Sequence, residues 1–103
     1  MIVRTWRGRA APSRSQAYPD HFRRNVLPEL HGIDGFRGAS LVRRNLGKEV
    51  EFLVMTRWSS MEAIRRFAGE NAERAVVEPE AVAALVSFDK TVEHYEVVED
   101  VSA

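Results

Sequence analysis

VEFLVMTRWSSMEAIRRFAG, residues 50–69, predicts a strand that runs directly into a helix. Every second residue from Val50 to Trp58 lies on one face of the strand, and Leu53 and Met55 lie on the other. Because both faces carry apolar side chains, we expect this strand to be covered on both sides.

The helix that follows has start and stop signals of its own. Ser59 and Glu62 have the spacing of a capping box, and apolar residues follow at helical intervals. Gly69 favours termination because glycine adopts the left-handed conformation that ends many helices. Trp58 therefore stands where a strand meets a helix, a place that is either a packed corner or the floor of a pocket.

The remaining elements are predicted from both sides of this stretch. Alternating or apolar runs indicate strands over residues 2–9, 36–46 and 90–98. A helix with an apolar residue every four positions begins after Ser15, or later with Pro19 in its first turn, and Pro28 should kink or tighten its end. A third, short helix begins at Pro79, before the last strand. Residues 70–78 follow no period, and 100–103 resemble a frayed tail.

The order of elements is β-α-β-β-α-β, which is the ferredoxin-like arrangement in the α+β class. We expect residues 1–103 to form one domain, with a four-stranded antiparallel sheet and helices on one face. The short link at 46–49 predicts a hairpin between the second and third strands. Since the other sheet face has no second helical layer, we expect a homodimer through the sheet face.

Composition excludes several classes of function. Lys and Arg together number 15, as do Asp and Glu, so a nucleic-acid or anionic-membrane partner is not expected. The basic clusters, including the one at 4–9, are interpreted as solvated faces. There is no Cys, no apolar run of about 20 residues, and no signal-peptide core at the N-terminus. These features fit a cytoplasmic protein without a membrane span.

Two residues are candidates for catalysis. His21 lies on the flank of the apolar helical stripe, where it could act as a base near neutral pH. The alternative is a partly exposed helix histidine without a role. Trp58 could stack on an aromatic ligand or donate its indole N–H. The alternative for Trp58 is a core side chain that seals the corner between strand and helix.

Three aromatic residues are candidates for substrate binding: Trp6, Tyr18 and Phe67. His94 is interpreted as an interface or sheet-surface residue. The three histidines are far apart and lack metal-ligand spacing, so no metal site is predicted. The glycines follow no phosphate-loop pattern, so nucleotide binding is not indicated either.

Four segments resemble the antibiotic biosynthesis monooxygenase (ABM) family of the dimeric α+β barrel superfamily: AYPDHF at 17–22, GFRGASLVRR at 35–44, TRW at 56–58 and VEHYEVV at 92–98. The resemblance extends over nearly the whole chain and implies a dimeric α+β barrel. In characterised members a pocket lies between sheet and helices, and a Trp at the end of the third strand lines it. Trp58 matches that position.

The family includes oxygenases that oxidise aromatic polyketides without metal or flavin, haem-degrading monooxygenases, and members without an assigned activity. The polyketide oxygenases place a Tyr on the helix after the Trp, where this chain has Ile64 and Phe67. The haem degraders use a strand-one Asn and a helix His, and residues 59–78 contain no His.

The resemblance therefore suggests a monooxygenase that needs no cofactor and acts on a small aromatic or quinol substrate. One alternative is a non-catalytic dimer that binds a small ligand or serves a stress-related role. Another is a plain structural protein whose cavity is filled by its own side chains.

Overall fold

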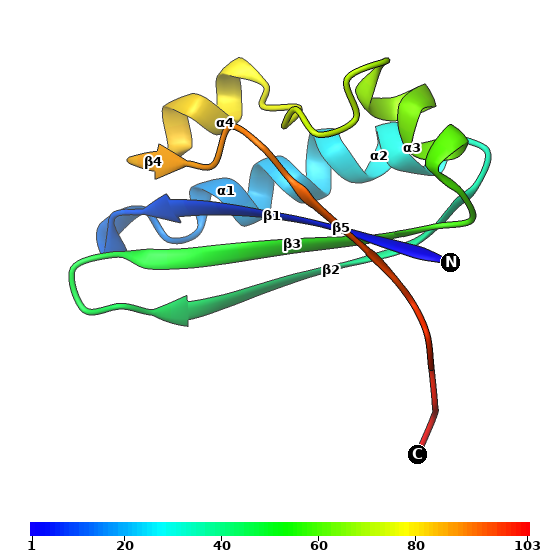
Figure 1. Cartoon of the computed structure of the whole chain (residues 1–103). Helices are drawn as coiled ribbons and strands as arrows, with labels where there is room; N and C mark the ends of the chain where they lie inside the picture. Colours follow the sequence, from blue (N-terminus) through cyan, green and yellow to red (C-terminus); the bar gives the residue numbers. More distant parts are fainter.

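One antiparallel sheet carries all the helices on a single face in the computed structural model of the protein, which describes residues 1–103 (Figure 1). The elements follow one another as β1 (Ile2–Ala10), η1 (Pro12–Arg14), α1 (Ala17–His21), η2 (Phe22–Val26), α2 (Leu27–His31), β2 (Phe36–Asn45), β3 (Val50–Trp58), α3 (Met61–Ala68), α4 (Pro79–Ala84), β4 (Ser87–Phe88) and β5 (Glu93–Glu96).

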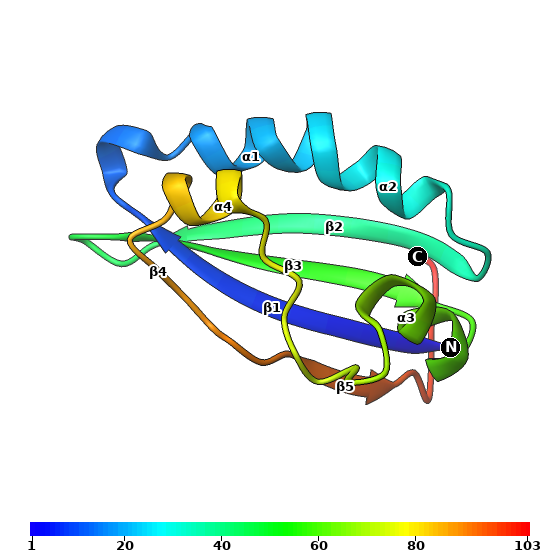
Figure 2. The same ribbon diagram turned by 90° about the horizontal axis from the view of Figure 1, so that it is seen from above.

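The strands lie in the order β2-β3-β1-β4, and β5 pairs with the same edge of β1 as β4 does. All pairings are antiparallel, and β2 and β3 form the predicted hairpin. Seen from above, α1 and α2 run along the sheet while α3 and α4 sit over its other half (Figure 2). This is the ferredoxin-like α+β fold that the order of elements predicts.

The alternation predicted for β3 is confirmed. Its residues from Val50 to Trp58 are buried at every second position, and the intervening ones are half-buried. The buried set packs against the helical layer, since Val50, Phe52 and Val54 share a core with Tyr18 and Phe22. By alternation the half-buried set lies on the other face of the sheet, which carries no helix (Figure 1). Register aligns Trp6 of β1 with Val54, and Arg4 with Thr56, so these four side chains share the helix-covered face.

The first long helix contains a wider turn than the sequence predicts. Residues Phe22–Val26 (η2) form π-helical turns between α1 and α2, and the N–H of Leu27 donates to the carbonyl of Phe22, five residues back. Pro28 follows directly and has no N–H for a regular helical bond. The chain therefore accommodates the proline by widening the turn before it, whereas a kinked or tightened helix end was expected.

The start of α3 differs by one residue from the predicted capping box. The side chain of Ser60, not Ser59, accepts the N–H of Ala63 at 3.1 Å. Ser59 is held elsewhere because its own N–H donates to the carbonyl of Gly35. Glu62 pairs with Arg66 at 3.2 Å instead of closing the box. The predicted stop at Gly69 is confirmed, with φ of 86°.

The strand predicted over 90–98 is shortened to β5 (Glu93–Glu96), and a further short strand, β4, precedes its predicted start. Between β4 and β5 the chain turns from β1 to the segment before α4. The N–H of Ala75 donates to the carbonyl of Lys90, and that of Val92 donates to the carbonyl of Glu73. An isolated bridge joins Arg74 to Thr91. Residues 90–92 therefore pair with 73–75, and β5 begins only after this pairing.

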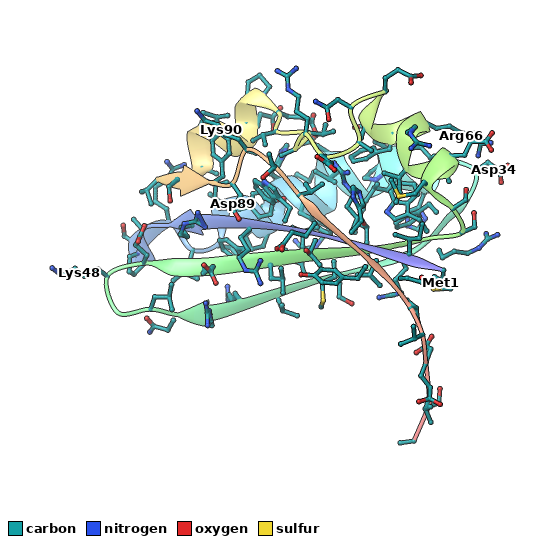
Figure 3. The ribbon with its side chains drawn as sticks, in the orientation of Figure 1. Met1, Asp34, Lys48, Arg66, Asp89 and Lys90 are labelled. Atoms are coloured by element: carbon teal, nitrogen blue, oxygen red, sulfur yellow. The ribbon has the colours of Figure 1, made fainter.

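Figure 3 places Lys48 at the tip of the β2–β3 hairpin and Asp34 beside Arg66 at the opposite end of the sheet. There the Arg66 guanidinium donates to the carbonyl of Asp34 at 3.0 Å. No helix has the length and apolarity that a membrane crossing demands. Residues 97–103 form no regular element, so the predicted tail at 100–103 is confirmed, but the strand before it ends at Glu96 and not at residue 98.

Candidate functional site

A small cavity lies between the helices and the sheet. Its free volume is about 50 Å³, and most of the side chains around it are apolar. The polar ones matter most for function: Arg4, Tyr18, His21, Thr56 and Glu78. Ligand pockets for drug-sized molecules measure about 300–1,000 Å³, so this cavity in its present form has room only for a few water molecules or for a molecule of similar size.

Four of the five residues chosen from the sequence line this one cavity: Trp6, Tyr18, His21 and Phe67. They come from β1, α1 and α3. The fold thus brings together residues as distant in the sequence as Trp6 and Phe67, which are 61 positions apart. The fifth, Trp58, does not line the cavity.

Trp58 is fully buried at the corner between β3 and α3. Its indole N–H donates to the hydroxyl of Thr56 at 2.8 Å, and its ring stacks on Phe67 with centroids 5.8 Å apart. Phe36 packs on it edge to face. Trp58 therefore stands one layer behind the cavity wall, where it holds Thr56 and Phe67, which do line the cavity.

His21 is buried in the cavity wall at the junction of α1 and η2. Its Nδ1 lies 2.9 Å from the side-chain nitrogen of Asn25 and 3.4 Å from a carboxylate oxygen of Glu80. Its Nε2 lies 3.9 Å from a carboxylate oxygen of Glu78, which also lines the cavity. The imidazole thus has a carboxylate near each ring nitrogen.

Tyr18 lies next to His21 and keeps its proton. Burial, and secondarily the charge of Glu78, raise the pKa of the Tyr18 hydroxyl well above its ordinary value. The hydroxyl makes no hydrogen bond within the chain. Tyr18 therefore presents a neutral, uncommitted hydrogen-bond donor to the cavity.

Trp6 forms the floor of the cavity on β1. Its ring packs against Tyr18 and Phe88, with centroids 5.7 and 6.3 Å apart. Its indole N–H is already used, since it donates to the carbonyl of Asp89 at 2.7 Å. Trp6 thus offers only its aromatic face to a ligand.

Arg4 is a polar residue of this site that the sequence analysis assigned to a solvated cluster. That interpretation is wrong for Arg4, which is 5% exposed. Its guanidinium donates to the backbone carbonyls of Ala72 and Arg74 and lies over the ring of Phe67. No carboxylate pairs with it. Burial lowers its pKa to about 10, which leaves the side chain charged at neutral pH.

His94 faces the helix-covered side of the sheet, opposite Arg4 in the β1–β5 register. Its Nε2 lies 3.1 Å from Nη1 of Arg4. Since an arginine only donates, His94 accepts this bond as a neutral imidazole. His94 was expected at an interface or on the sheet surface, whereas its contact is with the buried Arg4.

Glu78 was not predicted as a site residue, because residues 70–78 follow no periodic pattern. Arg4 could have been predicted, because the alternation of β1 places it on the same face as Trp6. No group of three His, Asp or Glu side chains is arranged to hold a metal ion.

The family model for antibiotic biosynthesis monooxygenases matches residues 1–79. The chain belongs to the ABM family. No curated protein matches the chain in sequence. The solved structures that resemble it include a putative ABM protein from Bacillus cereus, 20% identical, with a TM-score of 0.68 over 99% of this chain and 97% of that one.

Two further ABM-like structures have described activities. SnoaB from Streptomyces nogalater, a cofactor-independent oxygenase, is 14% identical, with a TM-score of 0.60 over 99% of this chain and 98% of that one. The heme-degrader MhuD from Mycobacterium tuberculosis, solved with two hemes in its active site, is 26% identical. Its TM-score is 0.55 over 99% of this chain and 100% of that one. The structural neighbours of this ABM chain therefore include a cofactor-independent oxygenase and a heme-degrader.

The pairing of His94 with Arg4 predicts a pH dependence of stability. Burial, and then the Arg4 charge, lower the pKa of His94 below its ordinary value. The unfolded chain therefore binds a proton at His94 more readily than the folded chain does. The free energy of unfolding should fall as the pH drops through about 6.5 toward the lower folded-state pKa.

Urea unfolding of the wild type and of His94→Gln, followed across this pH range, measures the effect. Gln keeps an acceptor for Arg4 but does not titrate, so the variant should lose less stability on acidification. Above pH 7 the two proteins should show the same pH slope. Identical slopes in the acid range as well would contradict this account of His94.

Proposed function

We propose that this ABM protein is a cofactor-independent monooxygenase that acts on a small phenol or quinol, with His21 as its general base. The observation that carries the proposal is the setting of His21. The imidazole is buried in the wall of an aromatic cavity and has carboxylates within 4 Å of both ring nitrogens. Such a setting suits a base that must become charged in an apolar place.

The base works through Nε2, which is on the cavity side together with Glu78. Asn25 Nδ2 lies 2.9 Å from Nδ1 and can only donate, so in the resting arrangement Nδ1 accepts and Nε2 carries the proton. The base form is the other tautomer: the Asn25 amide turns away, the proton moves to Nδ1 and faces Glu80 Oε2 at 3.4 Å, and Nε2 is free to accept. It takes the proton of the substrate hydroxyl and becomes imidazolium. Glu78, 3.9 Å from Nε2, then stabilises the positive charge.

The phenolate formed in this way reduces dioxygen itself, so no metal or flavin is needed for electron transfer. One electron passes to dioxygen, and the resulting radical pair combines into a peroxide on a ring carbon. Loss of water from this peroxide yields a quinone. One oxygen atom enters the product, the other leaves as water, and the substrate supplies all four electrons. Trp6 and Phe67 stack on the ring, while the neutral Tyr18 hydroxyl donates to the substrate oxygen.

The proposal requires the cavity to enlarge, because benzene needs a cavity of about 150 Å³ and the present one has about 50 Å³. Residues 76–78 form the wall most able to move. They belong to no helix or strand, they follow the backbone pairing of 73–75 with 90–92, and they carry the lining residues Val76 and Glu78. We infer that substrate binding displaces this segment.

Trp58 keeps its place in this proposal as a positioning residue. It does not face the cavity, so its effect on a substrate passes through Phe67 and Thr56, which it contacts directly. This use of Trp58 agrees with the alternative in which it seals the corner between strand and helix.

A second candidate function is haem degradation, which the 26% identity to the MhuD structure favours. The cavity between the helices and the sheet does not fit haem. A porphyrin is several times larger than benzene and the cavity has about 50 Å³. The only histidine that lines the cavity, His21, has carboxylates at both ring nitrogens. We therefore derive no step through haem. A non-catalytic small-ligand protein is the other alternative, and turnover separates it from the oxygenase.

The role of His21 as the general base is tested by measuring oxygen uptake in the presence of a panel of phenols and quinols. His21→Gln removes the proton acceptor and should lower kcat/KM by about 100-fold or more, the usual contribution of a general base. The matched control is His31→Gln, because His31 lies on α2 of the same helical run but is exposed and does not line the cavity.

His31→Gln should retain the full rate. Equal rates for His21→Gln and the wild type would reject His21 as the base. A wild-type protein that binds these phenols without consuming oxygen would favour the non-catalytic alternative.

We also propose that the sheet face without helices is the interface of a homodimer. The half-buried side chains of β3 on this face include Leu53 and Met55, and Tyr95 of β5 and Val42 of β2 are about half exposed beside them. An apolar sheet face of this kind is usually covered in the functional assembly.

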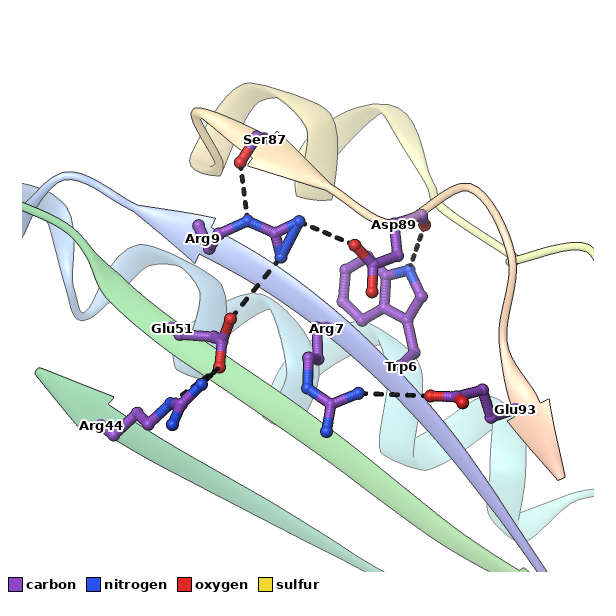
Figure 4. A network of polar contacts seen from close by, with 8 residues as sticks. All are labelled: Trp6, Arg7, Arg9, Arg44, Glu51, Ser87, Asp89 and Glu93. Atoms are coloured by element: carbon purple, nitrogen blue, oxygen red, sulfur yellow. Dashed lines mark hydrogen bonds and ion pairs between the residues drawn. The ribbon is translucent and has the colours of Figure 1, made fainter. Parts of the chain in front are cut away.

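The charges on the same face are largely neutralised within the chain, as Figure 4 shows. Arg9 pairs with Asp89 at 2.7 Å and lies 3.8 Å from Glu51, which in turn pairs with Arg44 at 2.8 Å. Arg7 pairs with Glu93 at 3.4 Å nearby. Paired charges cost less to take out of water than isolated ones, which supports burial of this face against a second copy.

Light scattering measures the assembly. The wild type should have twice the 11.7 kDa mass of one chain. Met55→Glu places a charge in the middle of the proposed interface and should yield monomers. Val82→Glu is the control, since Val82 is equally apolar and about half exposed but lies on α4, on the opposite side of the sheet. A wild-type monomer, or dissociation by Val82→Glu and not by Met55→Glu, would reject the interface.

A further inference from the structure

Arg4 is the one charged group in the cavity wall that the proposed reaction does not use. It lies on β1 at the end of the cavity that Thr56, Phe67 and Val92 surround, whereas His21 and Glu78 come from the helical layer. Its charge is buried, and the chain supplies no carboxylate to balance it. A buried charge without a counter-charge is costly.

The hydrogen bonds of Arg4 leave part of its guanidinium free. Nη1 donates to the carbonyl of Ala72 and to Nε2 of His94, and Nη2 donates to the carbonyl of Arg74. An arginine has five N–H groups, so two remain: Nε–H and one on Nη2. Nε and Nη2 share one edge of the planar group, and this edge binds the two oxygens of a carboxylate side by side.

The free edge is not sealed inside the protein. Thr5 Oγ1 is the one side-chain polar atom that is fully buried without a partner. Arg4 Nε also lacks a partner within the chain, so it must be reached by solvent, and Arg4 lines the cavity. The acceptors that hold Arg4 in place are two backbone carbonyls and the imidazole of His94, and together they fix the guanidinium before a ligand binds.

We propose that Arg4 is an anion-binding subsite, and that the molecule bound in this cavity carries a carboxylate, or an equivalent planar pair of anionic oxygens, at the end opposite its ionisable hydroxyl. The inference deepens the proposed function and rests on it for the hydroxyl end. Its ligand class is therefore a small hydroxyaromatic acid, with the ring between Trp6 and Phe67, the acid on Arg4 and the hydroxyl near His21 and Tyr18.

The chemistry of the other cavity residues supports this orientation. Glu78 is the only acidic side chain in the wall, and it lies 3.9 Å from His21. A carboxylate ligand would be repelled at that end and attracted at Arg4. Burial and the Arg4 charge lower the pKa of His94, which bonds to Arg4 as a neutral acceptor, so Arg4 is the only arginine or lysine that lines the cavity and it has no cationic neighbour in His94 at neutral pH.

Formate tests the anion-binding subsite by itself, because it is a planar carboxylate that has no aromatic ring and is small enough for the existing cavity. NMR of the arginine Nε–H resonances should show one resonance that shifts saturably with formate, and Arg4→Met should remove that resonance and its response. Formamide, which has the same shape without the charge, should produce no saturable shift in the wild type. This comparison does not depend on how well the variant folds.

Arg4→Lys separates charge from geometry, since lysine keeps the positive charge without the planar edge. It should bind formate at least tenfold more weakly than the wild type does. Absence of a saturable formate response in the wild type, or an equal response to formamide, would overturn the subsite. An unchanged response in Arg4→Met would overturn it as well.

Calorimetry with 4-hydroxybenzoate and 4-hydroxybenzamide then tests the ligand class. The acid should bind the wild type at least tenfold more tightly than the amide, and the preference should vanish in Arg4→Met. Equal affinities would overturn the ligand class while leaving the proposed oxygenation of neutral phenols intact. If formate binds and neither aromatic compound does, the subsite stands, and both the aromatic ligand class and the proposed function fail.

Discussion

The burial of Arg4 is the constraint on which much of this structure depends. A guanidinium held away from water, without a carboxylate, must obtain its hydrogen bonds from other groups. It takes two of them from the carbonyls of Ala72 and Arg74 and a third from His94. These bonds tie β1 both to β5 and to the segment that precedes α4. The same segment pairs with residues 90–92, which explains why β5 begins only at Glu93.

The same constraint shapes the cavity. Because residues 72–75 are drawn onto the end of β1, the chain that follows carries Val76 and Glu78 over the sheet and closes the space above Trp6. Glu78 then meets His21 from the helical layer and, by its charge, helps keep the Tyr18 hydroxyl protonated. Two chemically different ends result, one cationic and one with an acid–base pair. The proposed reaction uses the second, and the proposed anion subsite uses the first.

Local patterns in the sequence were sufficient for the fold. Two patterns each predict one buried face: the period-two alternation from Val50 to Trp58 and the helical stripe with a period of four residues. The structure confirms that these faces are turned toward the core. The predictions were wrong where the backbone of one element forms hydrogen bonds with a segment that is distant in the sequence. Ser60 rather than Ser59 caps α3 because the N–H of Ser59 bonds to Gly35, and the strand predicted over 90–98 begins only at Glu93 because 90–92 pair with 73–75.

Part of the candidate site could also be predicted from local patterns of apolar residues. Tyr18 and Trp6 line the cavity because apolar periodicity marks inward faces, and His21 sits on the flank of such a face. Arg4 was missed because basic residues are usually solvated, although its position on the inward face of β1 was already visible. Glu78 lies in an aperiodic segment and could not be placed. The cytoplasmic location, the single domain over 1–103 and the roles of the site residues stay predictions.

The central claim is that this cavity binds a phenol and removes its proton through His21. Anaerobic binding of 4-nitrophenol tests it most directly, because the phenolate has a visible absorption band and no oxygen is present to consume it. At a pH one unit below the pKa of the free phenol, the account predicts that binding produces the phenolate band in the wild type and not in His21→Gln. A bound phenol that stays protonated in the wild type, or an equal band in both proteins, would contradict it.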